Sequence, residues 1–250
     1  MRVRKKRHGS ERLAALSDLI YTIPAEGGRK DPKTEFANDS EIIMEVGCGK
    51  GDFIRELSMR EPSKNFLAVE RIGDVALVAM EKYAVSRNLG RLGYNGGWMD
   101  ENGILHPTGE KYEISPEKRG NVRFVIGDAA DIVASLPDGS LSGIIANFSD
   151  PWTRKNKYAK RRLTTPQFLG EYMRVLADGA SFSFKTDDEE LFDYTLEMLG
   201  EAGYRITFKT RDLHSSERAG NNIITEYERN FMEKGVSIKM LEAVPQKEKR

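Results

Sequence analysis

The chain has 250 residues and carries 39 Lys and Arg against 39 Asp and Glu, with a pI near 6.9. This length suits one large domain or one domain with additions, and the neutral charge argues against indiscriminate nucleic-acid binding while allowing a local basic patch. A single cysteine, Cys48, excludes an intramolecular disulfide framework, and three scattered histidines lack metal-ligand spacing. No apolar run approaches the ~20 residues of a membrane span, and none follows the cationic N-terminus as in a signal peptide. We therefore expect a soluble, cytoplasmic globular protein that binds neither a membrane nor a metal.

The first forty residues differ in character from the rest. They begin with the basic stretch "RVRKKR", and two prolines and two glycines interrupt them between residues 24 and 32, as is typical of loops. The pattern predicts a basic N-terminal arm over residues 1–40, with a short amphipathic segment at 11–20. The basic stretch is either a contact for RNA or a solvated terminus.

From residue 41 the chain alternates between strand and helix patterns, which predicts an α/β domain over residues 41–250. The helix that starts near Thr165 has Pro166 in its first turn, and we expect Asp178-Gly179 to end it. We also expect an acid-rich helix over 187–199 and a C-terminal hairpin over 225–243. Together these patterns predict a doubly wound, mostly parallel seven-stranded sheet with a C-terminal antiparallel strand, whose ligands bind beyond the carboxyl ends of the strands. The other expected strands are 41–46, 65–70, 122–128, 142–148, 181–186 and 204–210.

Residues 91–120 interrupt this alternation. They are rich in glycine and turn residues, and a loop of this length is unusual in a compact unit. Residues 91–115 hold two basic and four acidic residues, which makes them a poor ligand for phosphate. The segment leaves the second helix and precedes the third strand, so we expect an accessory insertion at the edge away from the cofactor. Apolar residues flank an Asn-Gly pair after Trp98, which predicts a small hairpin.

A glycine turn, "EVGCGKGD", follows the first strand directly. Gly47 and Gly49 have the spacing of a nucleoside-binding turn, but the dinucleotide fingerprint requires its third glycine one position after Gly51. That position is Asp52, whose carboxylate would compete with a pyrophosphate for the helix N-terminus. The turn therefore favours a cofactor without phosphate, such as S-adenosylmethionine.

Acidic residues stand at or near the ends of four consecutive strands. Glu70 follows Glu45 at an interval close to the ~20 residues at which an acid meets ribose hydroxyls. Asp128 and Asp150 follow the third and fourth strands. Any one of them could be a helix cap or a solvated turn. Four such acids in a row favour a cofactor and substrate site.

A dense basic run follows the corner "NFSDPW". Six of the nine residues from Arg154 to Arg162 are basic and none is acidic. A charge run is often only a solvated loop, but its place beside Asp150 favours contact with RNA phosphates. Trp152 could stack on a base or pack the corner. The expected phosphate ligands are Lys155, Lys160, Arg161 and Arg162.

The motifs "EVGCGKG", "NFSDPW", "AKRRLT", "FKTD", "DLHSSE" and "TEYE", in this order, resemble the tRNA (guanine-N(7)-)-methyltransferase family over about residues 41–242. The resemblance implies a Rossmann-like class I methyltransferase fold, S-adenosylmethionine as methyl donor, and a guanine of the tRNA variable loop as substrate. Asp150 would be the catalytic residue. The cofactor residues would be Glu45, Gly47, Gly49, Glu70, Asp128 and Asp150, and the substrate residues Arg154, Asp187, Thr225, Glu226, Tyr227 and Glu228.

Two of these substrate assignments also have ordinary structural interpretations. In a strand, Glu226 and Glu228 would share one face and could accept from the Watson–Crick donors of guanine, although the segment could be a plain edge strand. Asp187 could be a helix N-cap.

Three alternative functions stay open: another class I RNA methyltransferase, a nicotinamide-dependent oxidoreductase and a non-enzymatic RNA-binding module. Asp52 argues against the oxidoreductase, and the four strand-end acids argue against a module that binds RNA without catalysis. The sequence leaves open whether the protein is a monomer or a homodimer.

Overall fold

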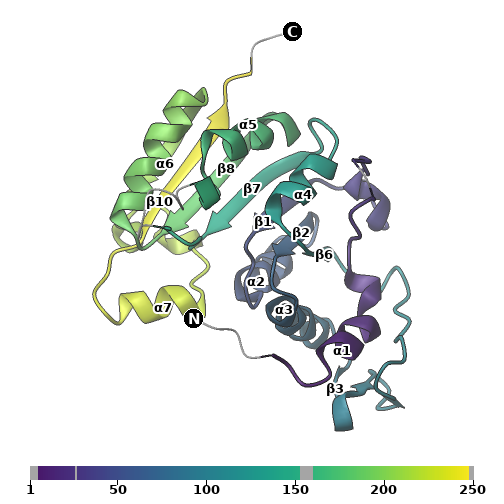
Figure 1. Ribbon diagram of the computed structural model, residues 1–250. Coiled ribbons are helices and arrows are strands. Elements are labelled where there is room, and N and C mark those ends of the chain that lie inside the picture. The colour runs from purple at the N-terminus through teal and green to yellow at the C-terminus, as the bar shows by residue number, and fades with distance from the viewer. Residues whose placement is uncertain (1–4, 26, 153–159, 248–250) are drawn as a thin grey trace.

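The computed structural model describes residues 5–25, 27–152 and 160–247. Within them, one sheet of seven strands runs in the order β6-β2-β1-β7-β8-β10-β9 (Figure 1). The pairs among β6, β2, β1, β7 and β8 are parallel, whereas β10 is antiparallel to both β8 and β9. The expected doubly wound, mostly parallel sheet with an antiparallel C-terminal strand is confirmed. The strands are β1 (Ile42–Val46), β2 (Asn65–Glu70), β6 (Val122–Ile126), β7 (Leu141–Asn147), β8 (Leu176–Thr186), β9 (Tyr204–Thr210) and β10 (Lys239–Pro245).

Helices cover both faces of the sheet because its central strands are apolar on both sides. In β2, Phe66 packs with the helices of one face and Leu67 with those of the other, as expected for parallel strands that are buried on both faces. The first face carries α2 (Asp52–Arg60) and α3 (Gly73–Ser86). The second carries α4 (Ala129–Ser135), α5 (Pro166–Val175) and α6 (Glu189–Glu201).

The glycine turn brings the start of α2 against α3. Gly51 has φ +78°, and a Cβ at this position would lie 2.7 Å from the Cβ of Ala79. A side chain at residue 51 would therefore strain the backbone and separate the two helices. This close approach fixes the position of the turn at the carboxyl end of β1.

The N-terminal segment packs onto the domain from residue 9 onward. Helix α1 (Gly9–Ala15) lies along α3, where Arg12 pairs with Glu81 at 2.6 Å. The backbone N–H of Tyr21 donates to Phe124 O of β6 at 2.8 Å, and Leu19 is fully buried. This part of the expected arm therefore belongs to the core of the domain.

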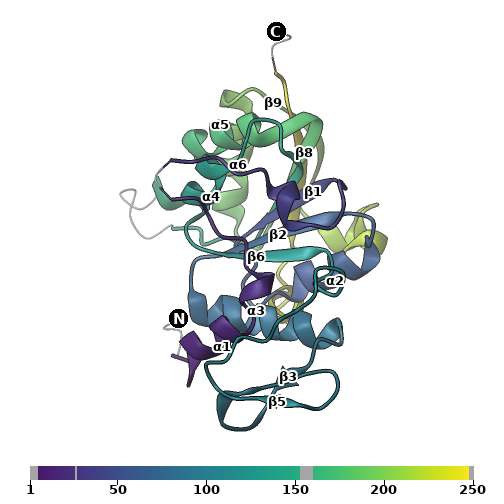
Figure 2. The ribbon, with the colours of Figure 1, turned by 90° about the vertical axis from the view of Figure 1, so that its right-hand side faces the viewer.

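The predicted insertion forms a small antiparallel sheet at one end of the molecule (Figure 2). Strands β3 (Arg91–Leu92), β4 (Trp98–Met99) and β5 (Leu105–His106) pair in sequence, so the expected hairpin is confirmed. Trp98 is buried, and its indole N–H donates to Leu89 O at 3.1 Å. The insertion follows the carboxyl end of α3.

Three local predictions were wrong. The segment "TEYE" is not a strand, because Thr225 caps the helix α7 (Glu226–Met232) and its Oγ1 accepts from the N–H of Glu228 at 3.1 Å. Asp188 rather than Asp187 caps α6. Helix α5 ends at Val175, before the Asp-Gly pair, because β8 already begins at Leu176.

Candidate active site

A pocket of about 480 Å³ lies at the carboxyl ends of β1 and β7. The glycine turn and the start of α3 form one wall, and α7 forms the other. The predicted residues that line the pocket are Glu45, Gly47, Gly49, Thr225, Glu226 and Tyr227. Five other predicted acids that the structure describes lie outside the pocket lining: Glu70, Asp128, Asp150, Asp187 and Glu228.

Glu70 holds the glycine turn in shape. One of its carboxylate oxygens accepts from the backbone N–H of Gly49 at 3.2 Å, and the other accepts from that of Ile72 at 2.8 Å. Gly47 and Gly49 both have positive φ, at +79° and +57°. The turn therefore keeps its backbone close to the pocket without side chains in the way.

Glu45 lies buried at the base of the pocket with an unused acceptor. Its Oε1 accepts from the side-chain amide of Asn147 at 3.4 Å, whereas its Oε2 and the Oδ1 of Asn147 are buried without a hydrogen-bond partner. Burial raises the pKa of Glu45 to about 8, against the hydrogen bond from Asn147 and the charge of Lys185, which lower it. Two buried acceptors without partners at a pocket base indicate a site for a ligand that donates hydrogen bonds, such as an ammonium group.

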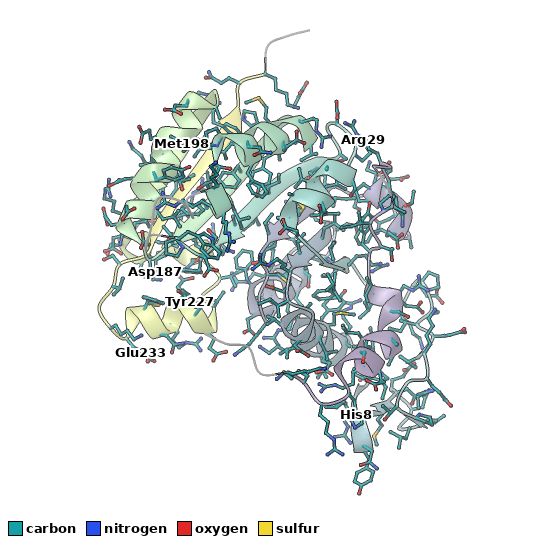
Figure 3. All side chains as sticks on the ribbon, viewed as in Figure 1. His8, Arg29, Asp187, Met198, Tyr227 and Glu233 are labelled. Carbon is teal, nitrogen blue, oxygen red and sulfur yellow. The ribbon has the colours of Figure 1, made fainter. Side chains whose placement is uncertain are left out.

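Asp150, Asp187 and Tyr227 come together at the outer side of the same edge. Burial raises the pKa of Tyr227 to about 12, and the charges of Asp187 and then Asp150 add to this shift. Burial also raises the pKa of Asp187. Figure 3 shows Asp187 and Tyr227 near each other, from the end of β8 and from α7 respectively. The arrangement joins two carboxylates and an aromatic ring, which suits a ligand that gains positive charge.

The corner after β7 is strained. Phe148 and Trp152 have positive φ, at +51° and +49°, which is rare for bulky residues and is found where the surrounding structure holds it in place. The ring of Phe148 packs on that of Tyr227 with centroids 4.9 Å apart, and Tyr227 packs on Phe231 at 4.8 Å. The corner is therefore tied to α7 by aromatic contacts.

Asp128 lies apart from these groups. Its carboxylate is exposed and caps α4 by accepting from the N–H of Ala130 at 3.0 Å. It stands after β6, two strands away from β1 in the sheet. At this position Asp128 could contact the far end of an extended ligand, or it could serve only as the helix cap of α4.

The basic run is only partly described. Arg154 and Lys155 lie outside the described residues. Lys160 and Arg161 are exposed, and the guanidinium of Arg161 stands 5.2 Å from the ring centroid of Trp152.

The assignment of Arg162 to phosphate contact needs correction. Its side chain is buried, donates to Pro151 O at 2.8 Å and pairs with Glu190 at 3.1 Å. It also stands over the ring of Tyr194 at 4.3 Å. In this structure Arg162 holds the corner instead of facing a ligand.

Glu228 also differs from its predicted role. It is fully buried, and both oxygens are engaged by Lys185, His214 and Asn222. In this structure it presents no acceptor to a base, because α7 turns it toward the sheet. The Thr-x-x-Glu spacing of a capping box was the signal for this helix in the sequence.

Sequence reasoning missed Asn147, Phe148 and Lys185 as members of the site. Asn147 and Phe148 belong to the quoted corner motif, and their place three and two residues before Asp150 was the available signal. Lys185, within "FKTD", gave no signal, because a lysine in a strand is usually exposed.

Neither a membrane span nor a metal site is found in the described part of the chain. None of its helices combines the length and apolarity needed to cross a bilayer. Among the same residues, no group of three or more His, Cys, Asp and Glu side chains is arranged to hold a metal ion.

Comparison of the sequence with known proteins gives two kinds of match. A family model described as "Putative methyltransferase" matches residues 39–241. The chain is also 32% identical to a tRNA (guanine-N(7)-)-methyltransferase of Bacillus cytotoxicus, over 97% of this chain and 96% of that protein.

Solved structures of methyltransferases share the fold. The crystal structure of the 16S rRNA methyltransferase KamB superposes with a TM-score of 0.52 at 13% identity, covering 87% of this chain and 94% of that chain. The antibiotic-resistance methyltransferase Kmr gives a TM-score of 0.50 at 14% identity, covering 85% and 90%.

Proposed function

The chain belongs to the tRNA (guanine-N(7)-)-methyltransferase family, and on this premise we propose that it methylates N7 of a guanine in the variable loop of tRNA. S-adenosylmethionine is the methyl donor, and when bound it supplies the methyl group as an electrophile on its sulfonium. The protein acts in the cytoplasm, where its tRNA substrate is found.

The residues of the pocket fit this cofactor. The unpartnered oxygens of Glu45 and Asn147 can accept from its ammonium group. The glycine turn lets the ligand approach the backbone, and we assign Glu70 at the end of β2 and Asp128 after β6 to the nucleoside part of the cofactor on the family resemblance. Asp52, at the start of α2, pairs with Lys82 at 2.7 Å. A carboxylate there suits a cofactor without phosphate.

The chemistry on the guanine requires positioning and charge compensation more than proton transfer. N7 carries a lone pair and no proton, so no general base is needed. Methylation leaves a cationic purine, and Asp150 and Asp187 can stabilise the charge that develops on it. Thr225, which caps α7, and Glu226 and Tyr227 in its first turn form the wall that orients the base in line with the methyl group.

The tRNA is held by cations beside the catalytic corner. Lys160 and Arg161 are exposed at the end of the basic run, and we assign Arg154 and Lys155 to the same surface on the family resemblance. These side chains bind flanking phosphates, which positions the loop without reading its sequence.

The observation that carries this proposal is the pair of buried acceptors without partners, Glu45 and Asn147, at the base of a pocket lined by the glycine turn and by Tyr227. The test is transfer of label from S-[methyl-³H]adenosylmethionine to bulk tRNA and, separately, to ribosomal RNA. We expect labelled tRNA, unlabelled ribosomal RNA, and loss of transfer in Glu45→Gln. Labelling of ribosomal RNA alone would point to another class I RNA methyltransferase. Cofactor and tRNA binding without transfer would contradict the enzymatic function.

A further inference from the structure

A buried ion pair lies directly behind the substrate wall of the pocket. Nζ of Lys185, on β8, donates to Oε2 of Glu228, on α7, at 3.0 Å. Lys185 is 2% exposed and Glu228 0% exposed. Lysine and glutamate are almost never fully buried unless they are paired, so this contact joins helix and sheet through two charges that depend on each other.

The remaining hydrogen-bonding groups of the pair are also satisfied. Nζ of Lys185 donates to Oδ1 of Asn222 at 3.0 Å and to Ile223 O at 3.2 Å. Oε1 of Glu228 accepts from the amide of Asn222 at 2.5 Å and lies 2.8 Å from Nε2 of His214, in the short helix Leu213–Ser215. A buried polar cluster with this many partners fixes one arrangement of the elements that it joins.

The pair also lies next to the aromatic contacts of the pocket. Nζ of Lys185 stands 5.1 Å from the ring centroid of Phe53 and 5.7 Å from that of Phe148. Phe148 in turn packs on Tyr227, the residue before Glu228. Displacement of Glu228 would therefore also move the Tyr227 ring, which lines the pocket.

The position of helix α7 against the sheet depends on the Lys185–Glu228 pair and on the contact between Tyr227 and Phe148. Figure 1 shows it beside the end of the sheet, apart from the helices that cover the two faces. In Figure 3, Tyr227 lies on the side of α7 that faces Asp187, whereas Glu233 lies on the opposite side. Of the described residues of α7, Glu228 is the one that is buried, so the attachment is concentrated in the first turn of the helix.

We propose that Lys185 and Glu228 are positioning residues, whose buried ion pair fixes α7 against the sheet and so builds the substrate wall of the pocket. The inference rests on the proposed function for its catalytic consequence. In this proposal Glu228 does not make the contact with the guanine that the family resemblance implied. It acts indirectly, by holding Tyr227 in place.

The test is a double-mutant cycle with Lys185→Met, Glu228→Gln and the combined variant. Removal of one partner leaves an uncompensated buried charge, whereas neutralising both leaves groups that can pack and hydrogen-bond. Amide hydrogen exchange in residues 226–232, measured without tRNA, should rise about tenfold or more in each single variant and fall back in the combined one. Glu233→Gln removes the same charge from the exposed end of α7 and should change nothing.

Kinetics supply the second readout. In Glu228→Gln we expect kcat for tRNA methylation to fall about a hundredfold, while the Kd for S-adenosylhomocysteine stays within about threefold. The combined variant should regain at least about tenfold of the lost kcat.

If Glu228 contacts the guanine directly, Glu228→Gln and the combined variant will be equally inactive with unchanged exchange in α7, and the proposal is wrong. Unchanged exchange in both single variants overturns it whatever the activity. If the wild-type protein does not methylate tRNA, the exchange cycle still decides whether the pair fixes α7.

Discussion

At the scale of single residues, the burial of Glu45 bears directly on its proposed role in cofactor binding. Its pKa is raised to about 8 from an ordinary value of 4.5 because the carboxyl is buried, so at pH 7 the free protein holds it mostly protonated. Pairing with an ammonium group favours the carboxylate, and cofactor binding should therefore release close to one proton.

We predict that the affinity for S-adenosylhomocysteine rises by up to about tenfold between pH 6 and pH 7. Calorimetry in buffers of different ionisation enthalpy should report the released proton, and Glu45→Gln should abolish both effects. The free protein should also lose stability as the pH rises from about 4.5 to 8, because the folded state binds the additional proton. Affinity that does not change with pH would contradict the pairing.

The next prediction concerns Asp150. We expect Asp150→Ala to lower methyl transfer by about a hundredfold or more, because in the proposed function its carboxylate stabilises the positive charge that develops on the base. Asp178→Ala serves as the control, since that side chain is 96% exposed at the other end of β8. Turnover assays with matched thermal unfolding would check both variants, and near-normal turnover in folded Asp150→Ala would remove the catalytic assignment.

The exposed and the buried cations at the end of the basic run should respond differently. Lys160→Ala with Arg161→Ala should weaken tRNA binding and lower its salt slope by about 1 to 2, as expected for one or two lost phosphate contacts. Arg162→Ala should instead lower the unfolding free energy by about 2 kcal/mol, because its buried contacts are lost. Filter binding at several salt concentrations and thermal unfolding measure these effects, with Arg60→Ala as the surface control. An unchanged salt slope in the first variant would exclude a phosphate role.

How far the sequence predicts the site depends on the residue. Glu45, Gly47 and Gly49 were predictable because a glycine turn after a strand fixes its own place at the sheet edge. Lys185 and Arg162 were not, because burial of a cation depends on partners from distant segments. Those partners, Glu228 and Glu190, come together only in the fold.

At the scale of elements, α7 shows the limit of a short pattern. The alternation in "TEYE" fits a strand, but the Thr225 cap and a buried Glu228 stabilise a helix instead. The sheet strands were predictable because their apolar runs are long and bounded by turns. A seven-residue helix held by tertiary contacts has only the short Thr-x-x-Glu spacing of a capping box as its signal.

The insertion gives a prediction at the same scale. Residues 91–110 follow the carboxyl end of α3, whereas Val75 near its other end lines the pocket. Replacement of these residues by a short turn, with the buried Tyr112 and Ile114 retained, should therefore preserve tRNA methylation. The unfolding temperature should fall, because the burial of Trp98 is lost. Loss of activity at saturating tRNA and cofactor in a folded variant would show that the insertion reaches the active edge.

At the scale of the whole molecule, the candidate functional residues gather at one edge of the sheet, although the net charge of the protein is zero. The sheet order places β1 and β7 side by side in the middle, so the glycine turn and the Asp150 corner meet at their carboxyl ends. The basic run adjoins this corner, and α7 forms the opposite wall of the pocket. In the proposed function, this one edge therefore binds the cofactor, the base and the flanking phosphates.

The central claim is methylation of guanine N7 in the tRNA variable loop. The most direct measurement is to incubate unmodified tRNA transcripts with the protein and S-adenosylmethionine, and then to map 7-methylguanine by reduction and strand cleavage at the modified base. We predict one cleavage position, at a variable-loop guanine, and none with Asp150→Ala. Methylation of a different atom or a different RNA, or no modified base with saturating cofactor, would contradict the account.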